Sequence, residues 1–310
     1  MLANLKLPED LNKLSFEELE VLAKEIRQFL IETISTHGGH LAPNLGVVEL
    51  TIALHKVFNS PYDKIIWDVG HQSYVHKILT GRLENFRTLR QRGGLSGFPK
   101  PEESPHDIFA TGHSSTSISV GLGLTKGQEL LGEKHKVISV IGDGSLTGGL
   151  AFEALNNAGH LKPDLIVILN DNEMSIAPNV GALSNYLSRA RINPKLFKLK
   201  ADFEQLIQRI PKVGETTFRY FDKFKDSLKY LVIPGILFEE LGFTYIGPVD
   251  GHNLRQLSQT LIDAKGHQGP ILIHVLTKKG KGYPPAEANP IRFHGVPGFE
   301  IDTGNLPTTS

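Results

Sequence analysis

The chain has 310 residues and 33 acidic and 33 basic side chains, so its formal charge is zero. This balance argues against a protein that coats nucleic acid, and the 40% of hydrophobic residues is enough to bury a core. The absence of cysteine excludes disulfides, thiolate metal sites and a cysteine nucleophile. No apolar run approaches the ~18 residues of a membrane span, and the N-terminus lacks a signal-peptide pattern, so we expect no membrane partner.

Helical patterns come first along the chain. Ser15 followed by Glu18 is a capping-box pattern, and apolar residues then recur at helical spacing to about Ser35. A second helical stretch is expected at about 47–58.

Four short runs of β-branched and leucine residues then predict strands that are buried on both faces. They are 65–67, 137–141, 165–169 and 271–275. Helical patterns separate them at 115–131, 149–159 and 254–265. Alternating strands and helices favour parallel pairing through right-handed crossovers. We therefore expect an α/β fold, a doubly wound and mostly parallel sheet with helices on both faces, in one domain over residues 1–310.

Residues 176–232 fit this sheet pattern poorly. Between Arg189 and Lys200 the chain has five basic residues and no acidic residue. The favoured interpretation is a solvated, mostly helical excursion. The alternative is a mobile segment beside the site that attracts an anionic substrate.

The sharpest chemical signal lies at the ends of two predicted strands. Asp143 follows the second strand within a Gly-Asp-Gly turn, and Asn172 follows the third. Because neighbouring parallel strands end at one edge of a sheet, these side chains are expected side by side. A carboxylate and an amide oxygen suit Mg²⁺ or Ca²⁺, and Gly144 lets a phosphate approach the backbone. We therefore predict a diphosphate held through a divalent ion; the glycines alone would indicate only a tight turn.

Other phosphate and metal motifs do not match. The third glycine of a dinucleotide fingerprint is displaced, and neither a nucleoside triphosphate loop nor an H-E-x-x-H zinc motif is present.

Three histidines beside glycines form the second signal. His40, His71 and His113 lie at expected element boundaries, where a histidine with a pKa near 6.5 can move protons or bind an anion. A purely structural role stays open for each, most of all for His113. The stretch Gly112–Thr116 precedes a helix, where its hydroxyls and amides can bind phosphate or cap the helix, and both interpretations remain open.

Longer blocks resemble the 1-deoxy-D-xylulose-5-phosphate synthase family of thiamine diphosphate enzymes. These blocks, which occur in the family's order, are His37–Gly46, Trp67–Gln72, Gly112–Ser117, Gly142–Glu153, Asn170–Ser175 and Gly247–His252. The resemblance covers about residues 14–306 and departs at Ser145, where many members have alanine.

The resemblance implies the thiamine diphosphate-binding fold and an enzyme that condenses pyruvate with D-glyceraldehyde 3-phosphate. The products are 1-deoxy-D-xylulose 5-phosphate, a precursor for isoprenoids and thiamine, and carbon dioxide. Thiamine diphosphate and Mg²⁺ are the implied cofactors. A homodimer is also implied, in the cytoplasm or, for a plant source, in the plastid stroma.

The resemblance also assigns roles to residues. The implied magnesium ligands are Asp143, Asn172 and the carbonyl of Met174. The implied cofactor contacts are His71, Gly112, His113, Ser114, Gly144, Ser145, Asn172 and Tyr283. The implied catalytic residues, which handle substrate and protons, are His40, His71 and His294.

From this resemblance we expect the chain to lack the family's pyrimidine-binding domain, with its cofactor-activating glutamate, and its C-terminal domain. The chain is therefore expected to be the diphosphate-binding half of the synthase, inactive by itself. Two alternatives remain: the N-terminal subunit of a split transketolase-like enzyme, and a non-catalytic cofactor-binding module.

Overall fold

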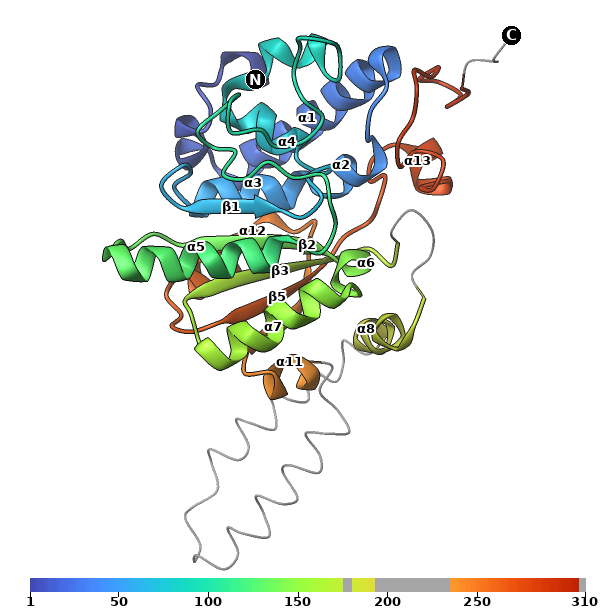
Figure 1. The fold of residues 1–310 in the computed structure, drawn as a ribbon. Helices are drawn as coiled ribbons and strands as arrows, with labels where there is room; N and C mark the ends of the chain where they lie inside the picture. The colour runs from blue at the N-terminus through green and yellow to red at the C-terminus, as the bar shows by residue number, and fades with distance from the viewer. Residues whose placement is uncertain (175–179, 193–234, 307–310) are drawn as a thin grey trace, which may run out of the picture.

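A parallel sheet of five strands, in the order β1-β2-β3-β5-β4, forms the centre of the computed structural model (Figure 1). The structure describes residues 1–174, 180–192 and 235–306. The strands are β1 (Lys64–Trp67), β2 (Val137–Gly142), β3 (Leu165–Asp171), β4 (Thr244–Asp250) and β5 (Ile271–Leu276). The expected α/β fold is confirmed.

Helices cover both faces of this sheet (Figure 1). The longer ones are α1 (Phe16–His37), α3 (Val48–Val57), α5 (Ser117–Leu131), α7 (Gly149–Leu161), α8 (Ala182–Ile192) and α12 (Leu254–Lys265). The short ones are α2 (Ala42–Gly46), α4 (Tyr74–Lys77), α6 (Asp143–Leu146), α11 (Ile236–Glu240) and α13 (Pro284–Ala288). Further single turns span Leu2–Asn4, Glu9–Lys13, Ile78–Arg82 and Glu84–Thr88.

Alternate side chains of each strand enter two separate hydrophobic clusters. Ile65 and Trp67 of β1 join the cluster that packs against α1, α3 and α12, whereas Ile66 joins the cluster beneath α5, α7 and α11. Successive residues of a strand point to opposite faces, so a sheet covered on both sides needs continuous apolar runs. This explains why the strands could be recognised without an alternating pattern.

The sequence patterns do not predict β4. Gly247 and Pro248 interrupt it, and its register with β5 shifts between Ile246 and Val249. Proline has no amide hydrogen to donate, so it is tolerated in a strand at the edge of a sheet, which is where β4 lies.

The expected capping box opens α1. The Ser15 side chain accepts a hydrogen bond from the Glu18 amide, and the Glu18 carboxylate accepts one from the Ser15 amide. The helix ends at Gly38, whose φ of 75° is in the left-handed region that favours glycine. The expected N-terminal helix is therefore confirmed.

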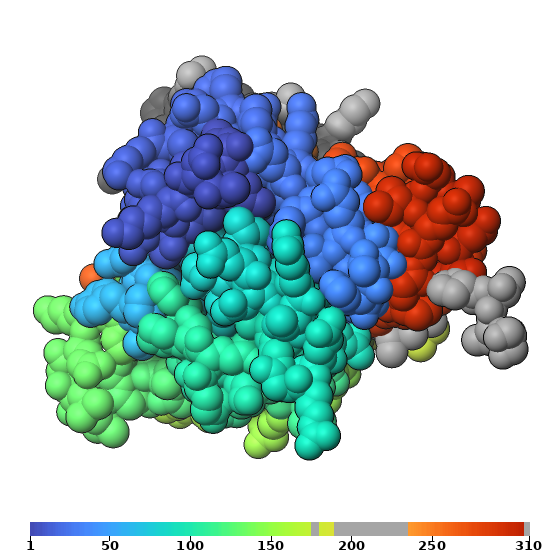
Figure 2. Space-filling view, turned by 90° about the horizontal axis from the view of Figure 1, so that it is seen from above, coloured from blue at the N-terminus to red at the C-terminus, as the bar shows by residue number. Residues whose placement is uncertain are grey.

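The segment after β5 returns to the N-terminal helices. Gly39 and Val296 form an antiparallel bridge, and Ala42 donates its amide hydrogen to the Phe293 carbonyl at 2.8 Å. Figure 2 shows this C-terminal segment (red) against N-terminal residues (blue). The contact brings residues 279 and 294 to the carboxyl ends of the strands.

The excursion expected at 176–232 lies largely outside the described residues, and of its described part α8 is helical as expected. Within residues 1–174, 180–192 and 235–306, no helix has the length and apolar character needed to cross a membrane.

Candidate active site

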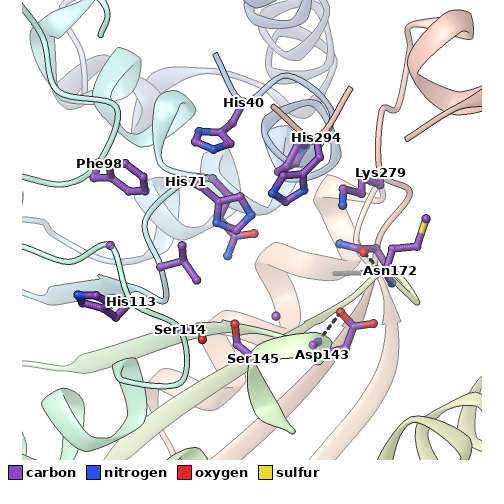
Figure 3. A pocket seen from close by; sticks show the side chains of 17 residues that line it. His40, His71, Phe98, His113, Ser114, Asp143, Ser145, Asn172, Lys279 and His294 are labelled. Atoms are coloured by element: carbon purple, nitrogen blue, oxygen red, sulfur yellow. Dashed lines mark hydrogen bonds between the residues drawn. The ribbon is translucent and has the colours of Figure 1, made fainter. Parts of the chain in front are cut away.

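A cavity of about 550 Å³ opens at the carboxyl ends of the strands, within the size range of small-molecule sites. Its wall comes from loops after β1, β2, β3 and β5 and from the start of α2 (Figure 3). The lining residues are His40, Pro43, Val69, His71, Gln72, Phe98, Gly112, His113, Ser114, Gly142, Asp143, Gly144, Ser145, Asn172, Met174, Lys279 and His294. All predicted site residues except Tyr283 therefore meet in one cavity.

Asp143 and Asn172 lie at the same end of this cavity (Figure 3). Adjacent strands place them there, because Gly142 of β2 is in register with Asn170 of β3. Asp143 is buried, and its Oδ1 accepts the Gly144 amide hydrogen at 3.0 Å. These two oxygen donors, with the neighbouring backbone carbonyls, fit a hard divalent cation.

This donor set is too small to enclose an ion. In the described part of the chain, no three His, Cys, Asp or Glu side chains gather as a possible metal site. A cation bound between Asp143 and Asn172 therefore needs further oxygen ligands from a bound molecule or water, and a phosphate group is a common source.

Lys279 is a site residue that the sequence interpretation missed. It lines the cavity beside Asn172 and is only 6% exposed (Figure 3). Burial lowers the pKa of Lys279 to about 8, although the charge of Asp143 opposes this shift. Its place after β5, at the carboxyl end of a parallel strand, is the signal that could have identified it.

His40, His71 and His294 form a cluster that lies above Asp143 in the view of Figure 3, with His294 beside Lys279. Their ring centroids are 5.1 to 5.7 Å apart. Burial is the main cause that lowers the pKa of His71 to about 3 and the pKa values of His40 and His294 to about 4. All three rings are therefore neutral near pH 7. Among the residues that the structure describes, the Nδ1 atoms of His71 and His294 are buried and have no hydrogen-bond partner, so they are available to a ligand.

A strained turn directs His71 into the cavity. Val69, which lines the cavity, has a φ of 59°, and Gly70 has a φ of 88°. A β-branched residue in the left-handed region is an outlier, and such strain concentrates at functional sites. A Cβ on Gly70 would come within 2.3 Å of Pro99, so a side chain is excluded there.

The loop before α5, at residues 112–116, was expected to bind phosphate, to cap the helix, or both. Gly112, His113 and Ser114 line the cavity, as expected. The amides of Ser115 and Ser117, however, donate to the buried carboxylate of Asp68 at 2.9 and 3.0 Å. These two amides are therefore satisfied by Asp68, and Thr116, the N-cap residue of α5, makes no side-chain capping bond to the helix within the described residues.

Tyr283 lies away from the cavity. Its ring is buried against Phe293 and Phe299, and its hydroxyl donates to the Ile301 carbonyl at 2.7 Å. In this structure Tyr283 holds the C-terminal segment together and does not line the site.

Comparison with known proteins shows which family this chain belongs to. The family model described as 1-deoxy-D-xylulose-5-phosphate synthase matches residues 2–277. The chain belongs to the 1-deoxy-D-xylulose-5-phosphate synthase family. The resemblance seen in the sequence blocks is thereby confirmed.

Two bacterial 1-deoxy-D-xylulose-5-phosphate synthases illustrate the relationship. The protein from Pelotomaculum thermopropionicum is 61% identical over 314 residues, and that from Natranaerobius thermophilus is 62% identical over 307 residues. Each match covers 99% of this chain but 49% of the relative. The chain thus spans about half the length of these relatives.

Solved transketolases share the fold of this synthase-family chain. The enzyme from Campylobacter jejuni has a TM-score of 0.66 at 21% identity, covering 92% of this chain and 41% of the transketolase. The enzyme from Leishmania mexicana has a TM-score of 0.64 at 21% identity, covering 89% and 39%.

Proposed function

We propose that the cavity binds thiamine diphosphate through Mg²⁺, and that this chain is the diphosphate-binding half of a 1-deoxy-D-xylulose-5-phosphate synthase. The buried carboxylate of Asp143, beside Asn172 and near Lys279, is the observation that carries this proposal. Family membership supports the proposed reaction, which joins pyruvate to D-glyceraldehyde 3-phosphate with loss of carbon dioxide.

In this proposal Asp143, Asn172 and the Met174 carbonyl hold Mg²⁺, and the diphosphate supplies the remaining oxygens. A shared coordination shell is supported by the lack, among the described residues, of three His, Cys, Asp or Glu side chains that could hold the ion together. Lys279 adds a positive charge inside a buried wall, where it attracts diphosphate oxygens more strongly than at an exposed site. Gly144 and Ser145 bring backbone close to the same group.

The bound cofactor would supply the electron sink for decarboxylation. His40, His71 and His294 are neutral near pH 7, so each ring can accept a proton at one nitrogen and donate from the other. We assign them to orienting the substrate carbonyl and moving its protons. The partnerless Nδ1 atoms of His71 and His294 support this role.

The proposal includes a second polypeptide part, in cis or in trans, that binds the pyrimidine ring. Support comes from the relatives, which are about twice as long as this chain. We also propose that the complete enzyme is a homodimer. A split enzyme, with the second half on a separate chain, is consistent with the same observation.

Calorimetric titration of thiamine diphosphate into the chain tests the binding proposal. We expect micromolar binding with Mg²⁺, loss of binding with a chelator, and loss of binding in Asp143→Ala. Asp302→Ala, which removes an exposed carboxylate, is the matched control and should bind as the unmodified chain does. Unchanged affinity in Asp143→Ala would refute the metal assignment.

Activity is tested by mixing the chain with the second half of a relative and following carbon dioxide release from pyruvate and D-glyceraldehyde 3-phosphate. We expect product only from the mixture. Tight cofactor binding without turnover in any mixture would instead favour the non-catalytic module.

A further inference from the structure

The loop that carries Lys279 is anchored by groups from three other parts of the chain. The Lys278 amide donates to Nε2 of His252 at 2.8 Å, and Nε of Arg27 donates to the Lys281 carbonyl at 3.1 Å. Between them, the Gly280 amide donates to the Ala42 carbonyl at 2.9 Å. The backbone on both sides of Lys279 is therefore fixed from outside the loop.

The two side-chain anchors share one carboxylate. Oε2 of Glu49, on α3, lies 3.0 Å from Nδ1 of His252 and 2.5 Å from Nη2 of Arg27. Burial by itself raises the pKa of Glu49, but the hydrogen bonds from His252 and Arg27 outweigh it and lower the pKa to about 2. Glu49 is therefore charged at neutral pH and accepts from both partners.

This arrangement determines the tautomer of neutral His252. A backbone amide can only donate, so the Nε2 that faces Lys278 must be unprotonated. The ring proton is then on Nδ1, where it points at Glu49. His252 is thus an acceptor toward the loop and a donor toward the carboxylate.

We propose that His252 is a positioning residue for Lys279: it links Glu49 to the Lys278 amide and so fixes the loop that presents Lys279 to the diphosphate. The link to diphosphate rests on the function proposed above, whereas the link to the loop does not. His252 itself does not line the cavity.

Two substitutions separate the hydrogen bond that His252 accepts from Lys278 from the one that it donates to Glu49. His252→Gln keeps an acceptor near the Nε2 position and so preserves the bond from Lys278. His252→Asn keeps a donor near the Nδ1 position but is too short to accept from Lys278. The same changes at the exposed His160, at the end of α7, are the matched controls.

Three measurements on the 310-residue chain test the proposal. Imidazole ¹⁵N spectra should show His252 as the Nδ1–H tautomer at neutral pH. Hydrogen exchange in residues 278–282 should speed up about tenfold or more in His252→Asn, stay near the starting rate in His252→Gln, and remain unchanged in segments remote from the loop. Affinity for inorganic diphosphate with Mg²⁺ should fall about tenfold in His252→Asn and be largely retained in His252→Gln.

Several results would overturn the proposal. An Nε2–H tautomer would remove the acceptor, and equal acceleration of exchange in both variants would show that the ring acts only by packing. Should His252→Asn fail to fold, the tautomer of His252 in the unmodified chain decides its role, and Arg27→Lys tests the second anchor, because lysine has no donor at the Nε position and loses the bond to Lys281. Unchanged exchange of 278–282 in Arg27→Lys would then contradict the anchoring.

The proposed function can be wrong while the positioning role of His252 is right. If the unmodified chain does not bind Mg²⁺ and diphosphate, the binding proposal is wrong, yet the tautomer and the exchange rates still decide whether His252 holds the loop.

Discussion

The side-chain amide of Asn44 donates a hydrogen bond to the backbone carbonyl of His71 at 2.8 Å, and its second hydrogen binds the carbonyl of His40 at 2.7 Å. The amide oxygen accepts from the Tyr74 amide at 2.8 Å. Asn44 is fully buried, so one residue joins the two backbone segments that carry His40 and His71.

We therefore expect Asn44→Ala to lower the free energy of unfolding by about 2–4 kcal/mol, because it leaves two carbonyls and one amide buried without partners. Urea unfolding measures this change. Asn156→Ala, on the exposed side of α7, is the control and should change stability by less than about 0.5 kcal/mol. Equal stability of Asn44→Ala and the unmodified chain would show that the bridge contributes nothing.

Lys279→Met should weaken binding of thiamine diphosphate in the presence of Mg²⁺ by about 10- to 100-fold, because a charge-assisted bond in a buried wall is lost. The neighbouring Lys278→Met is a close control, since the Lys278 side chain is exposed and pairs with Glu287. Calorimetry compares the two variants. If both bind with the same affinity, Lys279 is not a diphosphate contact.

Stability should fall as the pH is lowered from about 6.5 to about 4. Native His40 and His294 have pKa values of about 4 and His71 of about 3, all below the usual 6.5 of an unfolded chain. The unfolded state therefore binds more protons in this window, and each ring contributes up to about 1.4 kcal/mol per pH unit. Urea unfolding at pH 7, 6 and 5 measures the slope. His71→Asn should flatten it, and a stability that does not change with pH would contradict the neutral cluster.

Two glycines of α5 should respond in opposite ways to alanine. A Cβ on Gly121 would lie 2.3 Å from Oγ of the buried Ser139 in β2, so Gly121→Ala should destabilise the chain by about 1–3 kcal/mol. A Cβ on Gly123 would meet no atom of the described residues within 4 Å, so Gly123→Ala should stabilise the chain by about 0.5–1 kcal/mol. Thermal unfolding of the pair provides the comparison, and a stabilising Gly121→Ala would mean that α5 can move away from the sheet.

Local patterns predicted much of this fold because both faces of the sheet are covered. Continuous apolar runs predicted β2, β3 and β5, and the capping-box pattern at Ser15 predicted the start of α1. β4 was missed because Pro248 breaks its pattern and only its edge position makes the strand possible.

The part of the candidate site that lies at the ends of the neighbouring strands β2 and β3 could be predicted from the sequence. Asp143 and Asn172 meet because β2 and β3 are adjacent and parallel, a relationship that the 26 residues between Gly144 and Asp171 already indicated. Lys279 was not identified, and Tyr283 was assigned to the cofactor although it packs in an aromatic cluster. Both lie in the segment after β5, whose path depends on contacts with the N-terminal helices.

The sequence by itself predicted β1, β2, β3 and β5, the longer helices between them and the oxygen donors at two strand ends, because these depend on residues close together in the chain. Only the tertiary structure decided that Asp68 caps α5, that Asn44 joins the two histidine segments, and that His252 reaches the loop of Lys279. Each of these is a hydrogen bond between residues far apart in the chain, and its partner is set by the packing of the whole chain rather than by local pattern.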